Sequence, residues 1–405
     1  MAPFPIEESL GKLLAYGIYL IIGMGFGAAL EMSGFGNSNK LAAQFYFKDL
    51  TVLKVMFTAI ITAMVLIFLS SALGVLDYDA VWVNPTYLWP GIVGGLIMGV
   101  GFIIGGFCPG TSLVAAATLK IDGVFFALGG LFGIFLFGET VDRYAGFWNS
   151  SFYGRLTLFD WLGVPAGVIV LGVVLMALFM FWGGEQLEKI FGKRDLSKEP
   201  KGRYIGAAAL TVLAFVVLLI GQPTVEEKWE RIAAQKQPLL DERKVQIHPG
   251  ELLQLMHDDT RNLIMLDVRD ESDYNLFHIL DARRVDMADL HNAALALQTE
   301  PENSVVVLIC NNEIRSTQAW KQLVAEKASN VYILEGGLNY WLDLFEKGRA
   351  EAPQTREGEV LIHEFDAALG ARQPAADPDA HLSEHMTFTP KVQLTKKVKR
   401  QGGCG

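Results

Sequence analysis

Long apolar runs in the first half of the chain constrain its fold more than any other feature of the sequence. About 20 apolar residues in a helix cross a bilayer, and a backbone in lipid must satisfy its own hydrogen bonds. Runs of this kind lie at residues 13–33, 53–75, 88–107, 122–141, 161–182 and 204–221. Glu7 and Glu8 precede the first run in place of a basic cluster, so we expect it to remain as a span and not to be cleaved as a secretory signal. The sequence therefore predicts a polytopic α-helical membrane domain over residues 1–221.

The composition agrees with a membrane protein and argues against other classes. Hydrophobic residues make up 51% of the chain and charged residues only 19%. The net charge of −10 argues against a nucleic-acid partner, because phosphate binding needs an excess of Lys and Arg. The three cysteines, Cys108, Cys310 and Cys404, lie far apart and have no CxxC partner. The sequence therefore predicts no disulfide scaffold, no metal site and no cofactor.

The lysine and arginine residues of the short loops predict the orientation in the membrane. The loop 183–203 is the richest in these residues, whereas the loop 76–87 holds two aspartates and no base. Counting the spans places these further lysines on the side of the basic loop: Lys40, Lys48, Lys54 and Lys120. We expect this side to face the cytoplasm of a bacterial inner membrane. With six spans, both ends of the membrane domain lie on the other side, which places the C-terminal half in the periplasm.

The membrane half contains an internal repeat, which appears when residues 23–39 are laid on residues 95–112. In both units a glycine-rich apolar run ends in a break of small residues, followed by a short amphipathic piece (41–47 and 113–119) and another span. Each unit is predicted to form a helix, a re-entrant loop and a helix. Irregular backbone at membrane depth survives only where protein or water satisfies its polar groups, so two breaks indicate a lined pathway. Ordinary packing of small residues between helices is the alternative.

The second break concentrates the residues best suited to such a pathway. Proline and glycine there remove helical hydrogen bonds beside a thiol and two hydroxyls. Cys108 would line the path, although a lone cysteine is also a common small core residue. Gly36 falls opposite Cys108 in the first break. The predicted pathway residues are Gly36, Gly106, Cys108, Pro109, Gly110, Thr111 and Ser112.

The two repeat segments, GMGFGAALEMSGFG and GVGFIIGGFCPGTS, resemble the YeeE/YedE family of sulfur-compound transporters. The resemblance covers roughly residues 13–180, and GGFCPG is its most specific part. It implies uptake of thiosulfate or a related sulfur or selenium species through a pore marked by the loop cysteine. Gly36 stands where many members carry a cysteine, and the longer members have more repeats than this chain. A homodimer or a second membrane subunit would then complete the pathway.

After residue 222 charged residues become frequent and the apolar runs shrink to strand length. The charged, helix-permissive segment 222–244 is predicted to be a linker. Residues 245–350 alternate short strands with helical patterns, which is typical of an α/β fold around a mainly parallel sheet. The predicted strands are 245–247, 262–268, 304–309 and 331–334, and a helix is predicted at 249–257. Residues 351–405 have little to bury and are predicted to form a largely disordered tail ending in GGCG.

The most informative point of this half is the end of the strand 304–309. Cys310 follows it directly, and the next helix is predicted to open at Ser316 or Thr317. A helix N-terminus stabilises an anion and lowers the pKa of a neighbouring thiol, which favours a nucleophilic thiolate. Arg315 is predicted to lie beside the sulfur and to bind a doubly charged oxyanion through the N–H groups of its planar guanidinium. The alternative is a buried cysteine that only packs.

This half resembles the rhodanese (sulfurtransferase) domain over essentially its whole length. The matching segments are residues 266–269, Tyr274, 278–279, Ala282, 310–315, 335–337 and Trp341. The resemblance implies that Cys310 accepts a sulfane sulfur as a persulfide and passes it to a thiol, to cyanide or to another acceptor.

The same resemblance assigns roles around Cys310. Arg315 would bind the donor anion, and Asp267 and Arg269 would brace the loop. Glu313 stands where a glycine is usual, and a carboxylate turned inward there would oppose an anionic donor. A rhodanese domain that only binds or senses sulfur is the alternative reading.

Cys404 lies near the end of the chain, after the basic run 396–400. On a glycine-flexible tip it is a candidate relay that takes sulfur from Cys310, with a basic flank that lowers its pKa. A solvated basic tail beside anionic lipid is the simpler reading.

Together these features predict a membrane transporter for thiosulfate or a related sulfur species, coupled to a domain that carries sulfane sulfur on Cys310. The expected partners are a small sulfur anion, the lipid bilayer and a sulfur-acceptor thiol or protein. Two other functions stay open. The spans can serve only to anchor a sulfurtransferase, or Cys310 and Cys404 can form a disulfide or trisulfide that makes the chain a sulfur or redox sensor.

Overall fold

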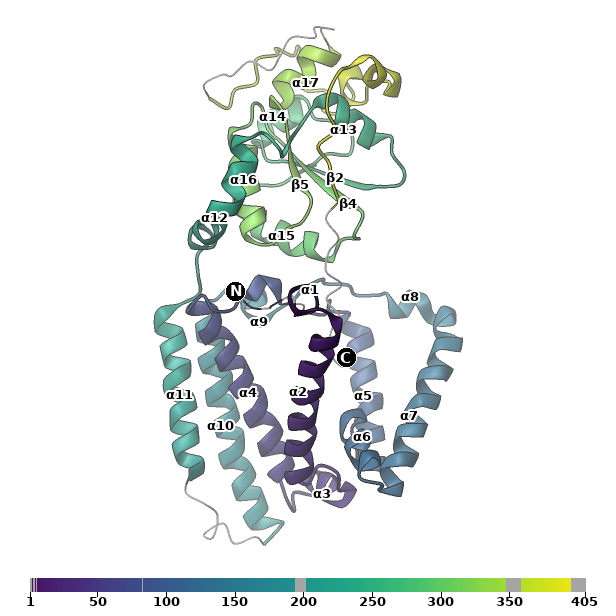
Figure 1. The fold of residues 1–405 in the computed structure, drawn as a ribbon, viewed down its shortest axis with the longest axis vertical. Helices are drawn as coiled ribbons and strands as arrows, with labels where there is room; N and C mark the ends of the chain where they lie inside the picture. The colour runs from purple at the N-terminus through teal and green to yellow at the C-terminus, as the bar shows by residue number, and fades with distance from the viewer. Residues whose placement is uncertain are drawn as a thin grey trace. The chain divides into compact units, whose positions relative to one another are not determined.

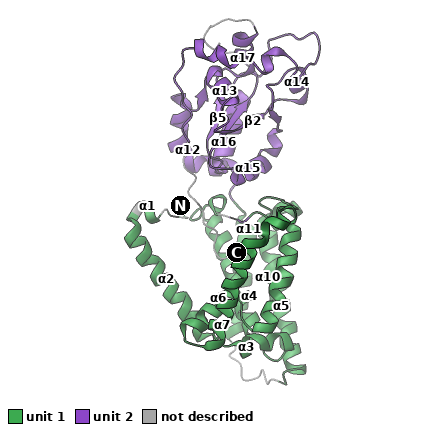
Figure 2. Ribbon diagram, turned by 90° about the vertical axis from the view of Figure 1, so that its right-hand side faces the viewer, with its two compact units in different colours: residues 1–81, 85–222 green, residues 82–84, 223–405 purple. Residues whose placement is uncertain are grey.

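The fold is taken from a computed structural model, which describes residues 2, 4, 6–81, 83–193, 202–346 and 358–394. The chain divides into two compact units, shown in different colours in Figure 2. Unit 1 holds residues 1–81 and 85–222, and unit 2 holds residues 82–84 and 223–405. Cys404 and the basic run before it lie outside the described residues, as does part of the basic loop, residues 194–201.

Unit 1 is built from long apolar helices (Figure 1). Six helical segments of the described chain are long and apolar enough to cross a membrane, which confirms the prediction of six spans. The six long helices are α2 (Lys12–Met32), α4 (Thr51–Ala72), α5 (Leu88–Gly105), α7 (Ile121–Thr140), α10 (Ala166–Ile190) and α11 (Gly202–Ile220). Shorter elements are α1 (Ile6–Leu10), α3 (Ser38–Ala42), η1 (Ala43–Tyr46), η2 (Tyr78–Ala80), α6 (Pro109–Ala117), η3 (Val141–Tyr144), α8 (Ala145–Trp148) and α9 (Leu158–Leu162). The protein is therefore a multi-pass membrane protein.

Helices α4, α10 and α11 form one packed group. Their shared core contains the buried residues Ile61, Val65, Phe68, Val170, Val174, Ala177, Ala214 and Val217. Gly167 lets α10 and α11 approach closely, because a Cβ atom there would lie 2.7 Å from the Cα atom of Leu218. Glu188 of α10 is fully buried, accepts a hydrogen bond from the N–H of Leu50 and pairs with Lys54 of α4. A buried carboxylate needs such partners, so this pair ties α10 to α4.

Both predicted breaks interrupt a helix where the glycine-rich runs end. After α2 the chain turns through residues 33–37 into α3 and then enters α4, and after α5 it turns through residues 106–108 into α6 and then α7. The order of elements is the same in the two segments, as a repeat of helix, loop and helix requires. That the two segments arose from one internal repeat stays a prediction.

The lysines predicted to share one side lie at one end of unit 1. Lys40 lies in α3, Lys54 in the first turn of α4, and Lys120 directly before α7. Figure 1 shows α3 and the start of α7 at the same end of this unit, with α1 and α9 at the other end. An even number of spans places the start of α2 and the end of α11 together, away from these lysines.

Unit 2 is a parallel α/β domain, which confirms the predicted fold class. Its described residues form five strands in the order β1-β5-β4-β2-β3, and each neighbouring pair is parallel. The strands are β1 (Gln246–Ile247), β2 (Asn262–Asp267), β3 (Arg283–Arg284), β4 (Ser304–Ile309) and β5 (Val331–Leu334). The helices are α12 (Val225–Asp241), α13 (Pro249–Met256), α14 (Glu271–Leu276), η5 (Met287–Asp289), α15 (Leu290–Thr299), α16 (Ile314–Ala325), α17 (Gly337–Phe345), η6 (Pro374–Ala376) and η7 (Ala380–His385).

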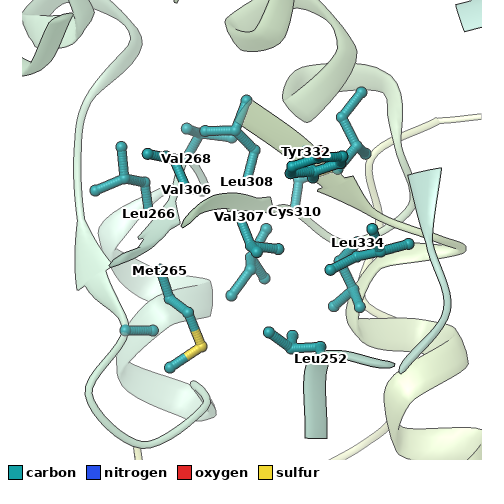
Figure 3. Packing of buried hydrophobic residues seen from close by; sticks show 14 of the residues in the cluster. Leu252, Met265, Leu266, Val268, Val306, Val307, Leu308, Cys310, Tyr332 and Leu334 are labelled. Carbon is teal, nitrogen blue, oxygen red and sulfur yellow. The ribbon is translucent and has the colours of Figure 1, made fainter. Parts of the chain in front are cut away.

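The central strand β4 is buried at all six of its residues. A parallel strand covered by helices on both faces needs apolar side chains on both, and the sequence SVVVLI supplies them. Figure 3 shows Cys310 among these core residues, just beyond Val306, Val307 and Leu308. The sheet therefore fixes the backbone that leads into Cys310.

The predicted linker 222–244 forms a helix that belongs to unit 2. Thr224 and Glu227 cap each other at its start in a reciprocal pair of hydrogen bonds. Trp229 packs edge to face against Trp320 of α16, with ring centroids 6.0 Å apart. This helix is thus part of the packed domain and is more than a spacer.

Residues 358–394, which belong to the predicted C-terminal tail, pack against the domain. Ala375 and Ala376 are buried, and the indole N–H of Trp341 donates to the carbonyl oxygen of Ala375 over 2.7 Å. Phe365 stacks on Phe277 with ring centroids 5.6 Å apart. These contacts offset the entropy cost of ordering a segment whose own composition favours disorder. The rest of the predicted tail, residues 351–357 and 395–405, lies outside the described residues.

Candidate functional site

The site in unit 2 is the loop that joins β4 to α16. The helix begins at Ile314, two residues before the earlier of the two predicted starts, and Glu313 precedes it as the N-cap. The first turn of α17 holds the other side of this loop. The N–H of Leu338 donates to the carbonyl oxygen of Cys310 over 2.9 Å, and that of Asn339 to the carbonyl oxygen of Asn311 over 3.1 Å. Two helix N-termini therefore shape the loop.

Gly337 makes the close approach of α17 to this loop possible. Its φ is +61°, and a Cβ atom there would lie 2.5 Å from the carbonyl oxygens of both Cys310 and Asn312. Any other side chain at this position would have to push the loop away.

We expect Gly337→Ala to displace the cysteine loop, because both the steric overlap and the left-handed backbone oppose alanine. Hydrogen exchange of the amides of residues 311–315 should become about 10- to 100-fold faster. The control is Gly221→Ala, which has a similar φ of +77° but no atom within 4 Å of the added Cβ. Unchanged exchange in the loop of the Gly337 variant would contradict the packing described above.

Cys310 is fully buried, with 0% of its surface exposed. Its Sγ lies 3.0 Å from the Oγ of Ser316 and accepts a hydrogen bond from the N–H of Ser316 over 3.4 Å. The thiol also donates to Oε1 of Glu359 over 3.3 Å. Desolvation, followed by the charge of Glu359, raises the pKa of the Cys310 thiol. The sequence predicts a lowered pKa, and that prediction is wrong because burial and a carboxylate outweigh the helix terminus.

Glu359 is the residue of this site that sequence reasoning missed. Its Oε2 accepts the N–H of Asn311 over 3.2 Å, and its Oε1 accepts the N–H of Arg315 over 3.0 Å. The loop N–H groups next to the cysteine thus bind an anion, as the helix N-terminus predicts. Glu359 lies far along the chain in a segment predicted to be disordered, so no local signal pointed to it.

Arg315 is oriented differently from the prediction. Its guanidinium pairs with the carboxylate of Asp270 over 2.8 Å, and this hydrogen bond raises the pKa of Arg315. The side chain is therefore engaged with Asp270 in this structure, while its backbone N–H binds Glu359.

Asp267 and Arg269 form a buried ion pair below the loop. The Nη2 atom of Arg269 lies 2.7 Å from Oδ2 of Asp267, and the two side chains are 1% and 0% exposed. Arg269 also donates to Oδ1 of Asn311 over 3.2 Å and to the carbonyl oxygen of Phe277 over 2.6 Å. The pair contacts the loop directly through Asn311, and its bracing role stays a prediction.

Glu313 does not oppose an anion at Cys310 in the way that the sequence suggests. Its carboxylate binds the guanidinium of Arg243 over 2.7 Å and accepts the N–H of Gly336 over 2.6 Å. Arg243 also pairs with Glu335 over 3.1 Å. The charge of Glu313 is thus compensated by a partner that lies far from it in the sequence.

In unit 1, Cys108 caps the N-terminus of α6. Its Sγ accepts the N–H of Thr111 over 3.4 Å and the hydroxyl of Thr111 over 3.3 Å, and the N–H of Cys108 donates back to that hydroxyl over 2.9 Å. Ser112 is buried beside them, and its hydroxyl donates to the carbonyl oxygen of Pro109 over 2.8 Å. Gly106 is buried, whereas Pro109 and Gly110 are exposed. The thiol is therefore half-buried at a helix N-terminus.

The two breaks of unit 1 lie against each other. A Cβ atom on Gly106 would lie 3.1 Å from the Cβ atom of Ser38, at the start of α3. Around this contact the structure buries one small cluster, formed by Phe35, Leu41, Val52, Phe107 and Ala115. The structure therefore brings the predicted pathway segments around Gly36 and Cys108 together.

Charged and polar groups also line this contact. Glu31 pairs with Lys120 over 3.0 Å, and both groups lie next to Gly36, where an added Cβ atom would crowd them. The hydroxyl of Ser38 donates to Asp122 over 2.8 Å. A charged residue inside an apolar run is a signal that could have identified Glu31.

These features define a class of protein: a multi-pass membrane protein fused to a parallel α/β domain with an anion-binding cysteine loop. Residues 32–237 match the family described as sulphur transport, and residues 248–344 match the rhodanese-like domain. The chain belongs to the sulphur transport family and carries a C-terminal rhodanese-like domain. Both resemblances drawn from the sequence are confirmed.

Two relatives resemble parts of the chain. The "Probable transporter YedE" of Escherichia coli (strain K12) is 25% identical over 190 residues, which are 46% of this chain and 44% of that protein. The "Uncharacterized protein YqhL" of Bacillus subtilis (strain 168) is 30% identical over 81 residues, which are 20% of this chain and 62% of that protein. The chain thus spans less than two thirds of the length of either relative. No solved structure matches the chain.

Proposed function

We propose that the membrane unit carries thiosulfate or a related small sulfur anion across a bacterial inner membrane, and that unit 2 carries sulfane sulfur as a persulfide on Cys310. The observation that supports this most directly is an anion, the carboxylate of Glu359, bound by two loop N–H groups against the thiol. A loop that binds one anion beside a nucleophile is suited to bind an anionic sulfur donor there.

Thiosulfate illustrates the chemistry that this loop would perform. Its oxyanion end takes the N–H groups of Asn311 and Arg315, and the thiolate of Cys310 attacks its outer sulfur. The sulfur–sulfur bond of thiosulfate breaks, and sulfite leaves with the electron pair while Cys310 becomes a persulfide. An acceptor thiolate or cyanide then attacks the outer sulfur of the persulfide, and Cys310 is released as the thiolate. In the same proposal Arg315 leaves Asp270 to bind the donor.

The membrane pathway is proposed to run past the two breaks that meet in unit 1. Cys108 faces the first turn of α6, where the backbone N–H groups favour an anionic cargo. A thiol suits such a cargo because sulfur–sulfur exchange attaches it reversibly. Gly36 and Gly106 have no side chain, which lets the two breaks pack closely together. Thr111 and Ser112 supply hydroxyls beside the thiol.

We expect Cys108→Ala to reduce uptake of labelled thiosulfate by about 10-fold or more in sulfur-starved cells that lack their own thiosulfate importers. The matched control is Leu113→Ala on the same short helix, whose side chain is 63% exposed on the apolar surface and should not matter. Protein levels in the membrane are compared by immunoblotting. Equal uptake by the Cys108 variant and the wild type would contradict a pathway past this thiol.

The same assay separates the proposed function from its alternatives. If the wild type imports no sulfur compound but transfers sulfur when purified, the membrane unit anchors a sulfurtransferase. A sensor that joins Cys310 to Cys404 would instead yield a cross-linked peptide in mass analysis without reductant. The further role of Cys404 as a relay arm stays a hypothesis on a residue outside the described chain.

The orientation is also proposed from the lysine distribution. The end of unit 1 that holds Lys40, Lys54 and Lys120 would face the cytoplasm. The chain leaves α11 at the opposite end, which assigns unit 2 to the periplasm. A homodimer or a second membrane subunit is proposed to complete a pathway that has only one cysteine break in this chain.

A further inference from the structure

The segment that carries Glu359 crosses the mouth of the cysteine loop and is held there by three asparagines. Asn311 donates to the carbonyl oxygen of Glu359 over 3.3 Å, and Asn312 donates to that of Gly358. Asn339 donates to the carbonyl oxygen of Val360 over 2.9 Å and accepts the N–H of Ile362 over 2.9 Å. Residues 358–362 therefore form a strap whose backbone is bound to the loop and to the first turn of α17.

The strap closes the site to reactants. Cys310 has no exposed surface, and one oxygen of Glu359 lies within hydrogen-bond distance of its sulfur. The two carboxylate oxygens also take the N–H groups of Asn311 and Arg315. A donor anion needs the same N–H groups and access to the same sulfur, so it cannot bind while Glu359 is in place.

We propose that Glu359 is a built-in competitor of the sulfur donor: its carboxylate fills the anion-binding loop at Cys310, and the strap must lift before an anionic donor enters. The inference rests on the proposed function of this loop. The domain then exchanges between the closed state described here and an open state that binds the donor, and only the open state reacts.

The charged groups around the thiol agree with a closed, unreactive state. Arg315 pairs with Asp270, Arg269 with Asp267 and Arg243 with Glu313, so each of these guanidinium groups near the loop is paired with another carboxylate. Asn311 also donates to the carboxylate of Asp273 over 2.7 Å. The negative charge of Glu359 directly beside the sulfur opposes a thiolate.

Glu359 also accepts a hydrogen bond from the thiol, which raises the question of whether it is a general base. A base that acts during the reaction must leave room for the substrate. The carboxylate here occupies both N–H groups of the loop as well as the thiol, which favours competition over catalysis. The two roles predict opposite effects of removing the charge, so one experiment separates them.

The first test measures access to Cys310 in the full-length protein in detergent. Alkylation of Cys310 by iodoacetamide at fixed pH is followed by peptide mass analysis in the wild type, Glu359→Gln and Glu359→Ala. Both variants should react about 10- to 100-fold faster, because the charge-assisted bonds that hold the strap are lost. Glu364→Gln removes the same charge from an exposed position of the same segment and should react like the wild type. Unchanged rates in both Glu359 variants would overturn the proposal.

The second test measures thiosulfate:cyanide sulfur transfer by the same preparations. Release of an internal competitor lowers the KM for thiosulfate by about 10-fold and leaves kcat nearly unchanged. A fall in kcat at constant KM would overturn the proposal in favour of a general base. If alkylation of Cys310 is faster in the Glu359 variants but no preparation transfers sulfur, the strap does control access to Cys310. The proposed reaction with thiosulfate is then wrong. If sulfur transfer proceeds with the same KM in all variants and Cys310 is alkylated at the same rate in all of them, the proposal that Glu359 competes with the donor is wrong. The sulfurtransferase function then stands.

Discussion

Replacing Cys310 by serine is expected to abolish sulfur transfer from thiosulfate to cyanide by the purified protein, with a loss of about 10³-fold or more. A serine hydroxyl has no accessible anionic form near neutral pH and cannot form a persulfide. The side chain sits at the end of the buried strand β4, where serine is close in size, so the fold should survive.

The readout is the amount of thiocyanate formed, together with the mass of the peptide that contains residue 310 after exposure to thiosulfate. The wild type should gain one sulfur atom on this peptide, and Cys310→Ser should gain none. The matched thiol control is Cys404→Ser, because cyanide takes sulfur directly from Cys310 and bypasses any relay. Transfer by Cys310→Ser at the wild-type rate would remove Cys310 from the proposed chemistry.

Truncating Arg269 is expected to destabilise unit 2 more than any substitution on its surface. Arg269→Ala leaves the carboxylate of Asp267 buried without its partner, which costs about 3–5 kcal/mol. It also removes the hydrogen bonds that Arg269 makes to Asn311 and to the carbonyl oxygen of Phe277. Loss of the contact to Asn311 loosens the cysteine loop as well, so sulfur transfer should fall with stability.

Hydrogen exchange of the amides of β2 and β4 in the full-length protein measures this effect. The stated cost corresponds to exchange about 10² to 10⁴ times faster than in the wild type, provided that these amides exchange through unfolding of unit 2. Lys244→Ala is the control, since its pair with Glu242 is more than half exposed at both side chains and should contribute about 0–1 kcal/mol. Replacing both Asp267 and Arg269 by leucine should recover part of the loss. Exchange of Arg269→Ala no faster than that of the control would contradict the bracing role.

The spans and strands could be predicted because their signals are local. A run such as 53–75 is long enough to cross a bilayer whatever surrounds it, and the structure has α4 at Thr51–Ala72. The strand 304–309 is apolar at nearly every position, and this pattern is typical of a strand buried on both faces. The position of Cys310 after this strand and before a helix followed directly from these two elements.

The chemistry around Cys310 depends on contacts that no local pattern contains. The direction of the pKa of the thiol is set by burial and by Glu359, and Glu359 lies in a segment whose composition favours disorder. The partner of Arg315 is Asp270, and that of Glu313 is Arg243, both distant in the sequence. Each of these ion pairs changes the electrostatic role that Arg315 or Glu313 would have without its partner.

What the sequence by itself determined is therefore the membrane-spanning half, the parallel α/β half and the identity of the two loop cysteines, Cys108 and Cys310. Only the tertiary structure decided that the two breaks of unit 1 pack together and that the strap 358–362 closes the cysteine loop. The physical reason is the range of the interactions. Apolar length and alternation act between neighbours along the chain, whereas a carboxylate that fills an anion site is brought there by hydrogen bonds and burial between segments far apart in sequence.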